Sequence, residues 1–434
     1  MTTIFAAPAL AALLALPAAS GSPALAPIDA LYPELEAFYI DLHRTPELST
    51  HEEKTSAKLA ERLRRLGYEV TDHVGGYGVV GVMKNGKGPT VLVRADMDAL
   101  PVEEQTGLPY ASKVKVVDDS GHTVPVMHAC GHDVHMTSLV GAAALLARAR
   151  ARWRGTLVLV GQPSEEGGPG SVGMLQDGFL ERFPKPDFAL ALHDDPRLPA
   201  GMIGYTPGYA LANSDVVDIT VYGRGGHGSA PQYTVDPIVV AARMILAFQT
   251  IVSRENDPLD PAVVTVGMIH GGTKRNIIPD EVTLALTVRS YKDEVRRKLL
   301  AAIERIAKAE AAAAGAPREP SVKIELGFGA TYNDPALTKR IVGALDRAFG
   351  TANVVEQAPV MGSEDFGEFG RAAHAPSLMF RLGAVAPARF EAVHGDVTQL
   401  PSLHSSRFAP DPEPTLKTGA GALTVAVLEI LGRK

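Results

Sequence analysis

The chain has 434 residues, of which 42 are Lys or Arg and 49 are Asp or Glu, and its net charge is −7. At about 150 residues per domain this length allows two or three domains, and the 46% of apolar residues is enough for a large core. The acidic balance argues against a general nucleic-acid-binding protein, which carries a basic face. The single cysteine, Cys130, cannot form an intramolecular disulfide, so no disulfide framework holds the fold.

The first 27 residues form a distinct segment. Residues 4–19 are apolar, but two prolines interrupt the run, and it is too short to cross a membrane as a helix. It resembles the apolar part of a signal peptide with small residues suited to cleavage at 18–20, although no Lys or Arg precedes Arg44. We expect an exported protein, periplasmic or secreted. The alternatives are a disordered leader or a misassigned start on a cytoplasmic protein.

Helices and strands alternate over residues 28–212. The helical spacing of apolar residues predicts helices within 30–68 and at 135–150. Short, nearly continuous apolar runs predict buried strands at 78–84, 89–97, 155–163 and 187–193. This alternation predicts an α/β sheet with helices on both faces.

A different pattern occupies residues 213–328. One strand is followed by a helix at 235–253, two strands, a helix at 293–314 and a last strand. The order βαββαβ is that of a ferredoxin-like unit. Because α/β character returns in residues 329–434, the predicted fold class is α/β, with one domain of residues 28–212 and 329–434 interrupted by a smaller one.

The densest group of candidate functional residues is the octapeptide HACGHDVH from His128 to His135. Three histidines, a thiol and a carboxylate so close together have the composition of a metal site, and a Cys-x-His pair can aim two donors at neighbouring metal positions. The alternative is a polar loop with incidental histidines. Use of Cys130 as a protease nucleophile is disfavoured, because a base two residues along rarely reaches the thiolate in a useful orientation.

Two adjacent carboxylates, Glu165 and Glu166, follow the strand at 155–163, where open α/β sheets place their sites. Adjacent carboxylates point in different directions, so one can bind a metal while the other serves as general base. The alternative is an acidic first turn of the following helix. The G-x-G-x-x-G pattern at 168–173 is weak evidence for dinucleotide binding, because it lies well beyond the strand and contains proline.

Further candidates follow other strands. Asp96, Asp98 and His193 stand at strand ends, and His404 lies in a polar segment near the C-terminus. A lone histidine is more often structural than a ligand, but the ends of parallel strands share one edge of the sheet. The thiolate of Cys130, three histidines and a glutamate make five ligands. That is more than one tetrahedral zinc needs, and it suits two metals with a bridging water.

A series of motifs occurs in order between about residues 34 and 430: LHRTPELSTHEEKTS, VRADMDALPVEEQTGLPYAS, MHACGHDVHM, GQPSEEGGPGS, GRGGHGSAP, NIIPDEVTLALTVR, MGSEDFGEF and LHSSRF. The series resembles the amidohydrolase branch of the M20 metallopeptidase family, which includes hippurate hydrolases, N-acyl-amino-acid amidohydrolases and auxin-conjugate hydrolases. The resemblance implies a dinuclear-metal catalytic α/β domain interrupted by a ferredoxin-like dimerisation or lid domain. It also implies a homodimer formed through that domain.

The resemblance assigns the metal site residue by residue. It implies five metal ligands, Cys130, His132, Glu166, His193 and His404. Glu165 is then the general base, and Asp98 takes the place of the family's orienting aspartate. Asp96 stands where other branches have a histidine ligand, so its role is left open.

The resemblance also implies residues that touch the substrate away from the metals. His227, in GGHGSAP, matches a lid histidine that stabilises the oxyanion, often from across the dimer. Without the resemblance, a turn histidine is the better interpretation. Asn276 and Arg289 match positions that hold the substrate's carboxylate. Asp194 and Asp195 follow His193 where the family has a less acidic segment, which leaves the substrate preference open.

Together these observations predict a hydrolase with two divalent metal ions per subunit, zinc or manganese, with cobalt or nickel as alternatives. The expected substrates are small N-acyl or aryl-acyl amino acids, and neither a nucleic-acid partner nor a membrane span is expected. Two alternatives remain: a dipeptidase or carboxypeptidase of the same fold, and a non-catalytic metal- or ligand-binding relative. The complete set of ligands with a base argues against the second.

Overall fold

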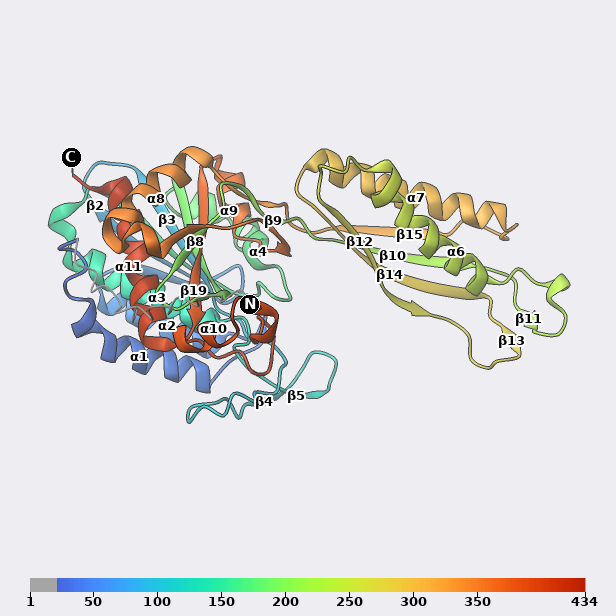
Figure 1. Ribbon diagram of the computed structural model, residues 1–434, viewed down its shortest axis with the longest axis horizontal. Coiled ribbons are helices and arrows are strands. Elements are labelled where there is room, and N and C mark those ends of the chain that lie inside the picture. The colour runs from blue at the N-terminus through green and yellow to red at the C-terminus, as the bar shows by residue number, and fades with distance from the viewer. Residues whose placement is uncertain (1–21, 434) are drawn as a thin grey trace, which may run out of the picture.

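The computed structural model describes residues 22–433 and consists of two bodies joined by a narrow junction (Figure 1). The larger body contains both ends of the described chain, and residues 215–326 build the smaller one. The expected leader falls mainly on residues outside the described range. Leu25 is only 2% exposed and packs in the main core, so the chain already belongs to the larger body at this point.

An eight-stranded mixed sheet forms the centre of the larger body. Its order is β1-β2-β6-β3-β7-β19-β8-β17, and β6, β3, β7 and β19 run parallel. The strands are β1 Glu69–Val74, β2 Gly78–Asn85, β3 Thr90–Asp96, β6 Gly155–Gln162, β7 Phe188–Pro199, β8 Ile203–Tyr205, β17 Val354–Glu356 and β19 Ser377–Val385. The predicted α/β class is confirmed for this mixed sheet.

Helices cover both faces of the sheet because alternate residues of each strand face opposite sides. In β3, Val91 and Val93 pack in one core and Leu92 in the other. The first face carries α1 Ile28–Arg44, α2 Glu53–Arg65, α3 His132–Arg148, α8 Pro335–Phe349 and α11 Pro412–Leu431. The second face carries α4 Gly170–Gln176, α5 Phe179–Arg182 and α9 Gly367–Ala373.

Several predicted elements of this body end elsewhere than expected. The helices predicted within 30–68 are α1 and α2, and α3 begins at His132 rather than at 135. Strand β7 continues past the predicted end at 193, because Asp194 and Asp195 still pair with β19. Because these residues are charged, the apolar pattern in the sequence ended before this part of the strand. They are tolerated there because neighbouring side chains pair with them.

The smaller body is an antiparallel sheet with two helices on one face (Figure 1). Its main elements follow the predicted order: β10 Asp215–Tyr222, α6 Pro237–Thr250, β12 Ala262–His270, β14 Glu281–Ser290, α7 Asp293–Ala313 and β15 Ser321–Leu326. The strand order is β12-β14-β10-β15. Alternate residues of β14 are buried, as expected for a sheet with one covered face. An apolar core of its own holds this body together.

Short elements complete the fold. One strand pair lies at the far tip of the smaller body, another lies in the larger body, and a three-stranded sheet lies at the junction. These are β11 Gly226–His227 with β13 Ile277–Ile278, β4 Lys115–Val117 with β5 Thr123–Pro125, and β9 Gly208–Ala212 with β16 Thr331–Asn333 and β18 Val360–Ser363. Helix α10 Pro387–Ala392 precedes α11.

Two helices of the described chain are long and apolar enough to cross a membrane by length and composition, Pro237–Glu255 and Pro412–Leu431. The second is α11, whose apolar window is 83% buried inside the larger body. The first contributes Val240, Met244 and Phe248 to the core of the smaller body. The expectation that no segment spans a membrane stays a prediction.

Candidate metal centre

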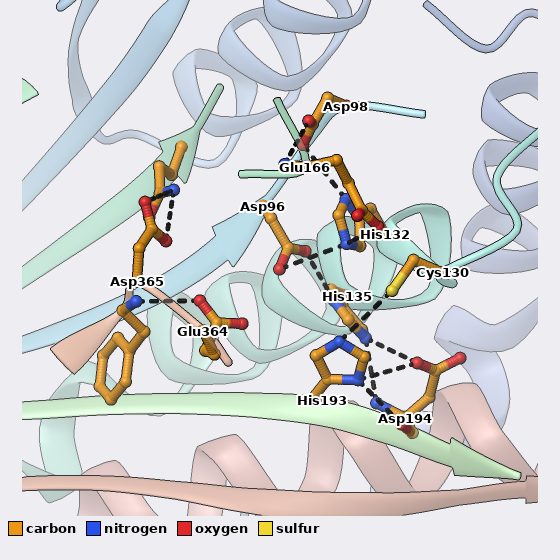
Figure 2. Close-up of polar contacts among 12 residues, drawn as sticks. Asp96, Asp98, Cys130, His132, His135, Glu166, His193, Asp194, Glu364 and Asp365 are labelled. Carbon is orange, nitrogen blue, oxygen red and sulfur yellow. Dashed lines mark hydrogen bonds and ion pairs between the residues drawn. The ribbon is translucent and has the colours of Figure 1, made fainter. Parts of the chain in front are cut away.

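The five side chains predicted as metal ligands lie together at the carboxyl edge of the parallel strands. They come from the turn into α3, the loop after β6, the strand β7 and a loop before α11, and are Cys130, His132, Glu166, His193 and His404. Each belongs to a group of three donor atoms that lie within 4.8 Å of one another. Figure 2 shows four of them pointing toward a common centre. The structure thus brings the predicted set together, and their role as ligands stays a prediction.

A glycine makes the turn that carries two of these residues. Gly131, between Cys130 and His132, has φ 78°, a left-handed conformation that suits glycine. A Cβ at this position would lie 2.0 Å from Oδ2 of Asp194. The motif therefore needs glycine both for its backbone and for the close approach of this carboxylate.

The donor atoms are spaced as ligands of a shared ion. Cys130 Sγ lies 3.6 Å from His193 Nε2, and Glu166 Oε1 lies 3.9 Å from His132 Nε2 and 3.2 Å from His404 Nε2. Metal–ligand bonds of about 2.0–2.3 Å separate neighbouring ligands of a tetrahedral ion by roughly 3.3–3.8 Å. His132 Nε2 and Glu166 Oε1 are buried without a well-aligned hydrogen-bond partner in the described chain. Buried polar atoms need a partner, so these residues fit a metal ion.

Asp98 is fixed beside His132. Its Oδ2 accepts hydrogen bonds from Ser49 Oγ at 2.6 Å and from the backbone N–H of Glu166 at 2.9 Å. Its Oδ1 lies 3.3 Å from His132 Nδ1. A carboxylate next to Nδ1 favours the tautomer that presents Nε2 to a metal. This is the geometry expected of an orienting aspartate.

Asp96 lies beside the histidines of α3 (Figure 2) and is also bound by a buried arginine, Arg94. Its Oδ1 is 2.6 Å from His135 Nδ1, its Oδ2 is 3.6 Å from His132 Nε2, and Arg94 donates to Oδ2 at 2.6 Å. Burial opposes ionisation, but the neighbouring His132, His135 and Arg94 hold the pKa of Asp96 well below its usual range. The donor atoms of Asp96, His132 and His135 form another group within 4.8 Å, so Asp96 lies beside the predicted ligands and its role stays open.

Two residues of the centre, His135 and Asp194, received no role from the sequence. His135 Nε2 lies 3.1 Å from Asp194 Oδ1, which is also 3.2 Å from His193 Nδ1. Asp194 is fully buried, so it holds two histidines in place and does not face solvent. The third histidine of HACGHDVH and the acidic residue after His193 were the signals that could have found them.

A buried ionic cluster lies next to the predicted base, Glu165. Arg94 donates to Gln162 Oε1 at 2.8 Å, to Glu364 Oε1 at 2.8 Å and to Asp365 Oδ1 at 2.9 Å. Burial, followed by the negative charges of Glu364 and Asp365, raises the pKa of Glu165 well above its usual range. A carboxylate with a raised pKa is suited to take a proton from water near neutral pH. The MGSEDFGEF motif was the sequence signal for this cluster.

The loop that carries the two glutamates contains a strained residue, Ser164, which hydrogen bonds hold in place. Ser164 has φ 57°, which is uncommon outside glycine and typical of functional sites. Its N–H donates to Glu52 Oε1 at 2.7 Å, and its Oγ accepts from the N–H of Thr50 at 2.9 Å. Burial raises the pKa of Glu52 to about 7. These bonds fix the directions in which Glu165 and Glu166 leave the loop.

A second buried network supports the turn into α3 from behind. His43 Nδ1 lies 2.7 Å from Asp133 Oδ2, and His43 Nε2 lies 3.2 Å from Glu104 Oε1. Burial alone lowers the pKa of His43, but its bonds to the two carboxylates raise it to about 9. The nearby His128 has no such partner, and burial lowers its pKa to about 4. His43 is therefore a buried cation that holds the HACGHDVH turn.

The predicted substrate residues are divided between two places. His227 and Asn276 are exposed at the far tip of the smaller body, where β11 pairs with β13, away from the metal centre of the same chain (Figure 1). Arg289 lies at the junction end of β14, and its Nη1 donates to the carbonyl of Met361 at 3.0 Å. Within one chain the structure brings only Arg289 toward the centre. The roles of all three stay predictions.

A cleft of about 820 Å³ opens over the centre. It is lined by Cys130, Glu165 and Glu166 from the larger body and by Arg289 and other residues of the junction. This volume lies in the range of small-molecule sites, and charged and apolar side chains share its walls. The cleft can hold a substrate of the size of an acyl amino acid.

Known proteins with similar sequences identify the family. The model of peptidase family M20/M25/M40 matches residues 92–403. The chain belongs to this family. It is 38% identical over 383 residues to thermostable carboxypeptidase 1 of Saccharolobus solfataricus, covering 87% of this chain and 91% of that protein. It is 39% identical over 340 residues to hippurate hydrolase of Campylobacter jejuni, and the match covers 77% of this chain and 85% of that protein.

A solved structure extends the comparison to the metal site. The YXEP protein of Bacillus subtilis, a dinuclear metal binding peptidase from the M20 family, superimposes with a TM-score of 0.75 at 29% identity, covering 93% of this chain and 100% of that one. The predicted M20 family is confirmed, and the chain is a hydrolase of amide bonds. The donor clusters of this chain and the dinuclear centre of that relative support metal binding.

Proposed function

We propose that this protein cleaves the amide bond of N-acyl or aryl-acyl amino acids with two divalent metal ions, zinc or manganese. The observation that carries the proposal is the convergence of five donors, from Cys130 to His404, with the glutamate Glu165 at one edge of a small-molecule cleft. Relatives named hippurate hydrolase and N-acetyl-L-cysteine deacetylase, 39% and 37% identical, support this substrate class.

In the proposed mechanism, the five donors from Cys130 to His404 would hold the metal ions, which would supply the Lewis acidity that lowers the pKa of the attacking water and polarises the scissile carbonyl. Glu165 takes a proton from the attacking water at its carboxylate and then gives it to the leaving amine. Asp98 keeps the ring of His132 in register, and Asp194 does the same for His193. Arg289, whose guanidinium lines the cleft, holds the substrate's carboxylate.

We further propose that the smaller body is a ferredoxin-like lid and dimerisation domain. Its βαββαβ order and its edge strands β12 and β15 support this role, because two such edges can pair across a twofold axis. His227 and Asn276 then reach a metal centre from a partner subunit or by closure of the two bodies. There His227 stabilises the oxyanion, and Asn276 shares the substrate carboxylate with Arg289.

A second candidate function is that of a carboxypeptidase on short peptides. The 38% identity to thermostable carboxypeptidase 1, over 87% of this chain, favours it. The same base and metal ligands serve both reactions, and the difference is whether the acyl group carries a free amine.

A hydrolysis screen separates the two candidates. Chelated enzyme is supplied with zinc, manganese, cobalt or nickel and assayed on N-acetyl, N-benzoyl and indoleacetyl amino acids and on dipeptides. We expect the chelated enzyme to be inactive, at least one metal to restore activity, and acyl amino acids to be cleaved faster than dipeptides. Preference for dipeptides favours the carboxypeptidase, and full activity after chelation contradicts metal catalysis.

A further inference from the structure

A second arginine, Arg381, is built into the wall of the cleft beside the metal centre. It lies in β19, where its backbone pairs directly with that of His193 in β7. Directly paired residues on neighbouring strands project to the same face, with strands about 4.8 Å apart. Arg381 lines the same cleft as Cys130, Glu165 and Glu166. The guanidinium is thus next to a predicted metal ligand and on its side of the sheet.

The nearest carboxylate to Arg381 is already used by another residue. Asp195 follows His193 by two positions and therefore faces the same side. Arg197 binds it with two nitrogens, Nε to Oδ1 at 2.9 Å and Nη2 to Oδ2 at 2.6 Å. Arg381 Nη1 lies 3.6 Å from Oδ2, beyond hydrogen-bond distance. Asp195 is thus bound by Arg197 through both oxygens, and it compensates Arg381 only through the longer ion pair.

The guanidinium of Arg381 consequently has only this longer ion pair within the described residues. Its side chain is only 8% exposed, and its buried Nη2 has no hydrogen-bond partner in the described part of the chain. An arginine cannot lose its charge, and burying a charge without a partner is costly. Arg94, the other deeply buried arginine of this sheet, bonds to three carboxylates. This contrast indicates that the guanidinium of Arg381 binds an anion from outside the chain.

Three arginines, Arg197, Arg289 and Arg381, line the cleft, and Asp195 is the carboxylate among them. The acidic residues Glu165 and Glu166 lie at the candidate metal centre, with donor atoms within 4.8 Å of His132. Such a wall attracts a negatively charged group of the substrate. Arg289 is proposed to bind the α-carboxylate of the substrate's amino acid, and Arg381 is then free to bind a second carboxylate of the substrate.

We propose that Arg381 is a specificity-determining residue that binds a second carboxylate of the substrate, so that this enzyme prefers acyl amino acids with two carboxylates. The inference rests on the proposed amidohydrolase function. The second carboxylate is either the side chain of an acidic amino acid or the free end of a dicarboxylic acyl group. Both present the planar anion that a guanidinium binds through two parallel hydrogen bonds.

The test compares three substrates and two variants in the metal-loaded enzyme. N-benzoylglycine has one carboxylate, N-benzoylglutamate adds one on the amino acid, and N-succinylglycine adds one on the acyl group. We expect the wild type to prefer one of the last two. Arg381→Met should lower kcat/KM for that substrate about 10- to 100-fold, mainly through KM, because hydrogen bonds to charged groups are lost. Arg381→Lys, which keeps the charge without the fork, should lose less, and N-benzoylglycine should change less than about threefold in either variant.

Matched controls separate binding from structure. Arg340→Met removes an exposed arginine of α8 that pairs with Glu429, and it should leave all three rates unchanged. Arg381→Met should not lower the melting temperature, because it removes a buried charge whose Nη2 has no hydrogen-bond partner in the described chain. Equal losses on all three substrates, or none, would overturn the inference, and so would a large fall in melting temperature.

A binding measurement distinguishes failure of this inference from failure of the proposed function. Hydrolysis of N-benzoylglycine without preference for a second carboxylate leaves the function standing and removes the role of Arg381. If none of the three substrates is hydrolysed, the proposed function fails. Calorimetric binding of N-benzoylglutamate and N-succinylglycine to the metal-loaded wild type and to Arg381→Met then decides. Tighter binding than that of N-benzoylglycine, lost in the variant, supports the anion site, and equal binding refutes it.

Discussion

The buried ionic cluster around Arg94 should dominate the stability of the larger body. Its guanidinium is fully buried and bonds to Asp96, Glu364 and Asp365 at 2.6, 2.8 and 2.9 Å. Arg94→Met keeps most of the side-chain volume and removes the guanidinium from this set of bonds. Glu364 and Asp365 then lose their buried ion-pair partner next to Glu165, and Asp96 keeps only its histidine neighbours.

The expected cost follows from these distances. At an effective dielectric constant of about 20, one pair at about 2.8 Å contributes roughly 6 kcal/mol of Coulomb attraction. Desolvation of each ion costs several kcal/mol, and the carboxylates repel one another, so most of this attraction is offset. Removing one partner of a buried ion pair typically costs about 3–5 kcal/mol. We expect a loss of this size, a large fraction of the ~5–15 kcal/mol that stabilises a typical protein.

Denaturant unfolding of the chelated protein measures this loss without interference from metal binding. Arg94→Met should unfold at a clearly lower denaturant concentration than the wild type near pH 8. The difference should shrink near pH 5, because the unpaired carboxylates can then take up protons and bury as neutral groups. The same unfolding midpoint as the wild type near pH 8 would refute the assignment of Arg94 as the compensating charge, and a loss independent of pH would refute the electrostatic reason.

Three further predictions concern the base, the lid and the buried histidine. Glu165→Gln should keep its metals and lose kcat by a factor of about 10² to 10⁴, and wild-type turnover in this variant would exclude Glu165 as the base. Inactive His227→Ala chains mixed with inactive Glu165→Gln chains should regain activity, because one site of each mixed dimer holds both groups. Absence of recovery after verified subunit exchange shows that His227 does not act in trans. The pKa of His43 is raised from an ordinary value of 6.5 to about 9. Protonated His43 therefore stabilises the fold fully at pH values below 6.5, and this contribution is lost as the pH rises through 9. His43→Gln should therefore lower the unfolding midpoint more at about pH 6 than at about pH 10, and equal losses contradict this linkage.

The positions of the site residues could be predicted where the signal is local. Asp96 and Glu165 follow apolar runs that end abruptly, and the ends of parallel strands meet at one edge of a sheet. The octapeptide around Cys130 combines donors within one turn. The smaller body could be predicted from its strand and helix order. His227 lies in it, at the tip, and no spacing along the chain indicates which copy of the centre it faces.

The partners of the buried charges could not be predicted, because they are distant in sequence. Arg94 bonds to Glu364 across 270 positions, and Gln162 bonds to Asp365 across 203. Apolar periodicity reports which face of a strand is covered and carries no information about which charge meets which. Asp194 was interpreted as a polar residue beyond the end of a strand, whereas it lies within β7 and holds two histidines.

Arg94 and Arg381 show why this missing information matters for function. In the sequence both are arginines inside largely apolar strands, β3 and β19, and the apolar pattern does not distinguish them. In the structure Arg94 is saturated by carboxylates of the chain, whereas Arg381 meets an aspartate that Arg197 already occupies. The same substitution to methionine should therefore have opposite consequences: a large loss of stability at Arg94, and a loss of affinity for a charged substrate without loss of stability at Arg381.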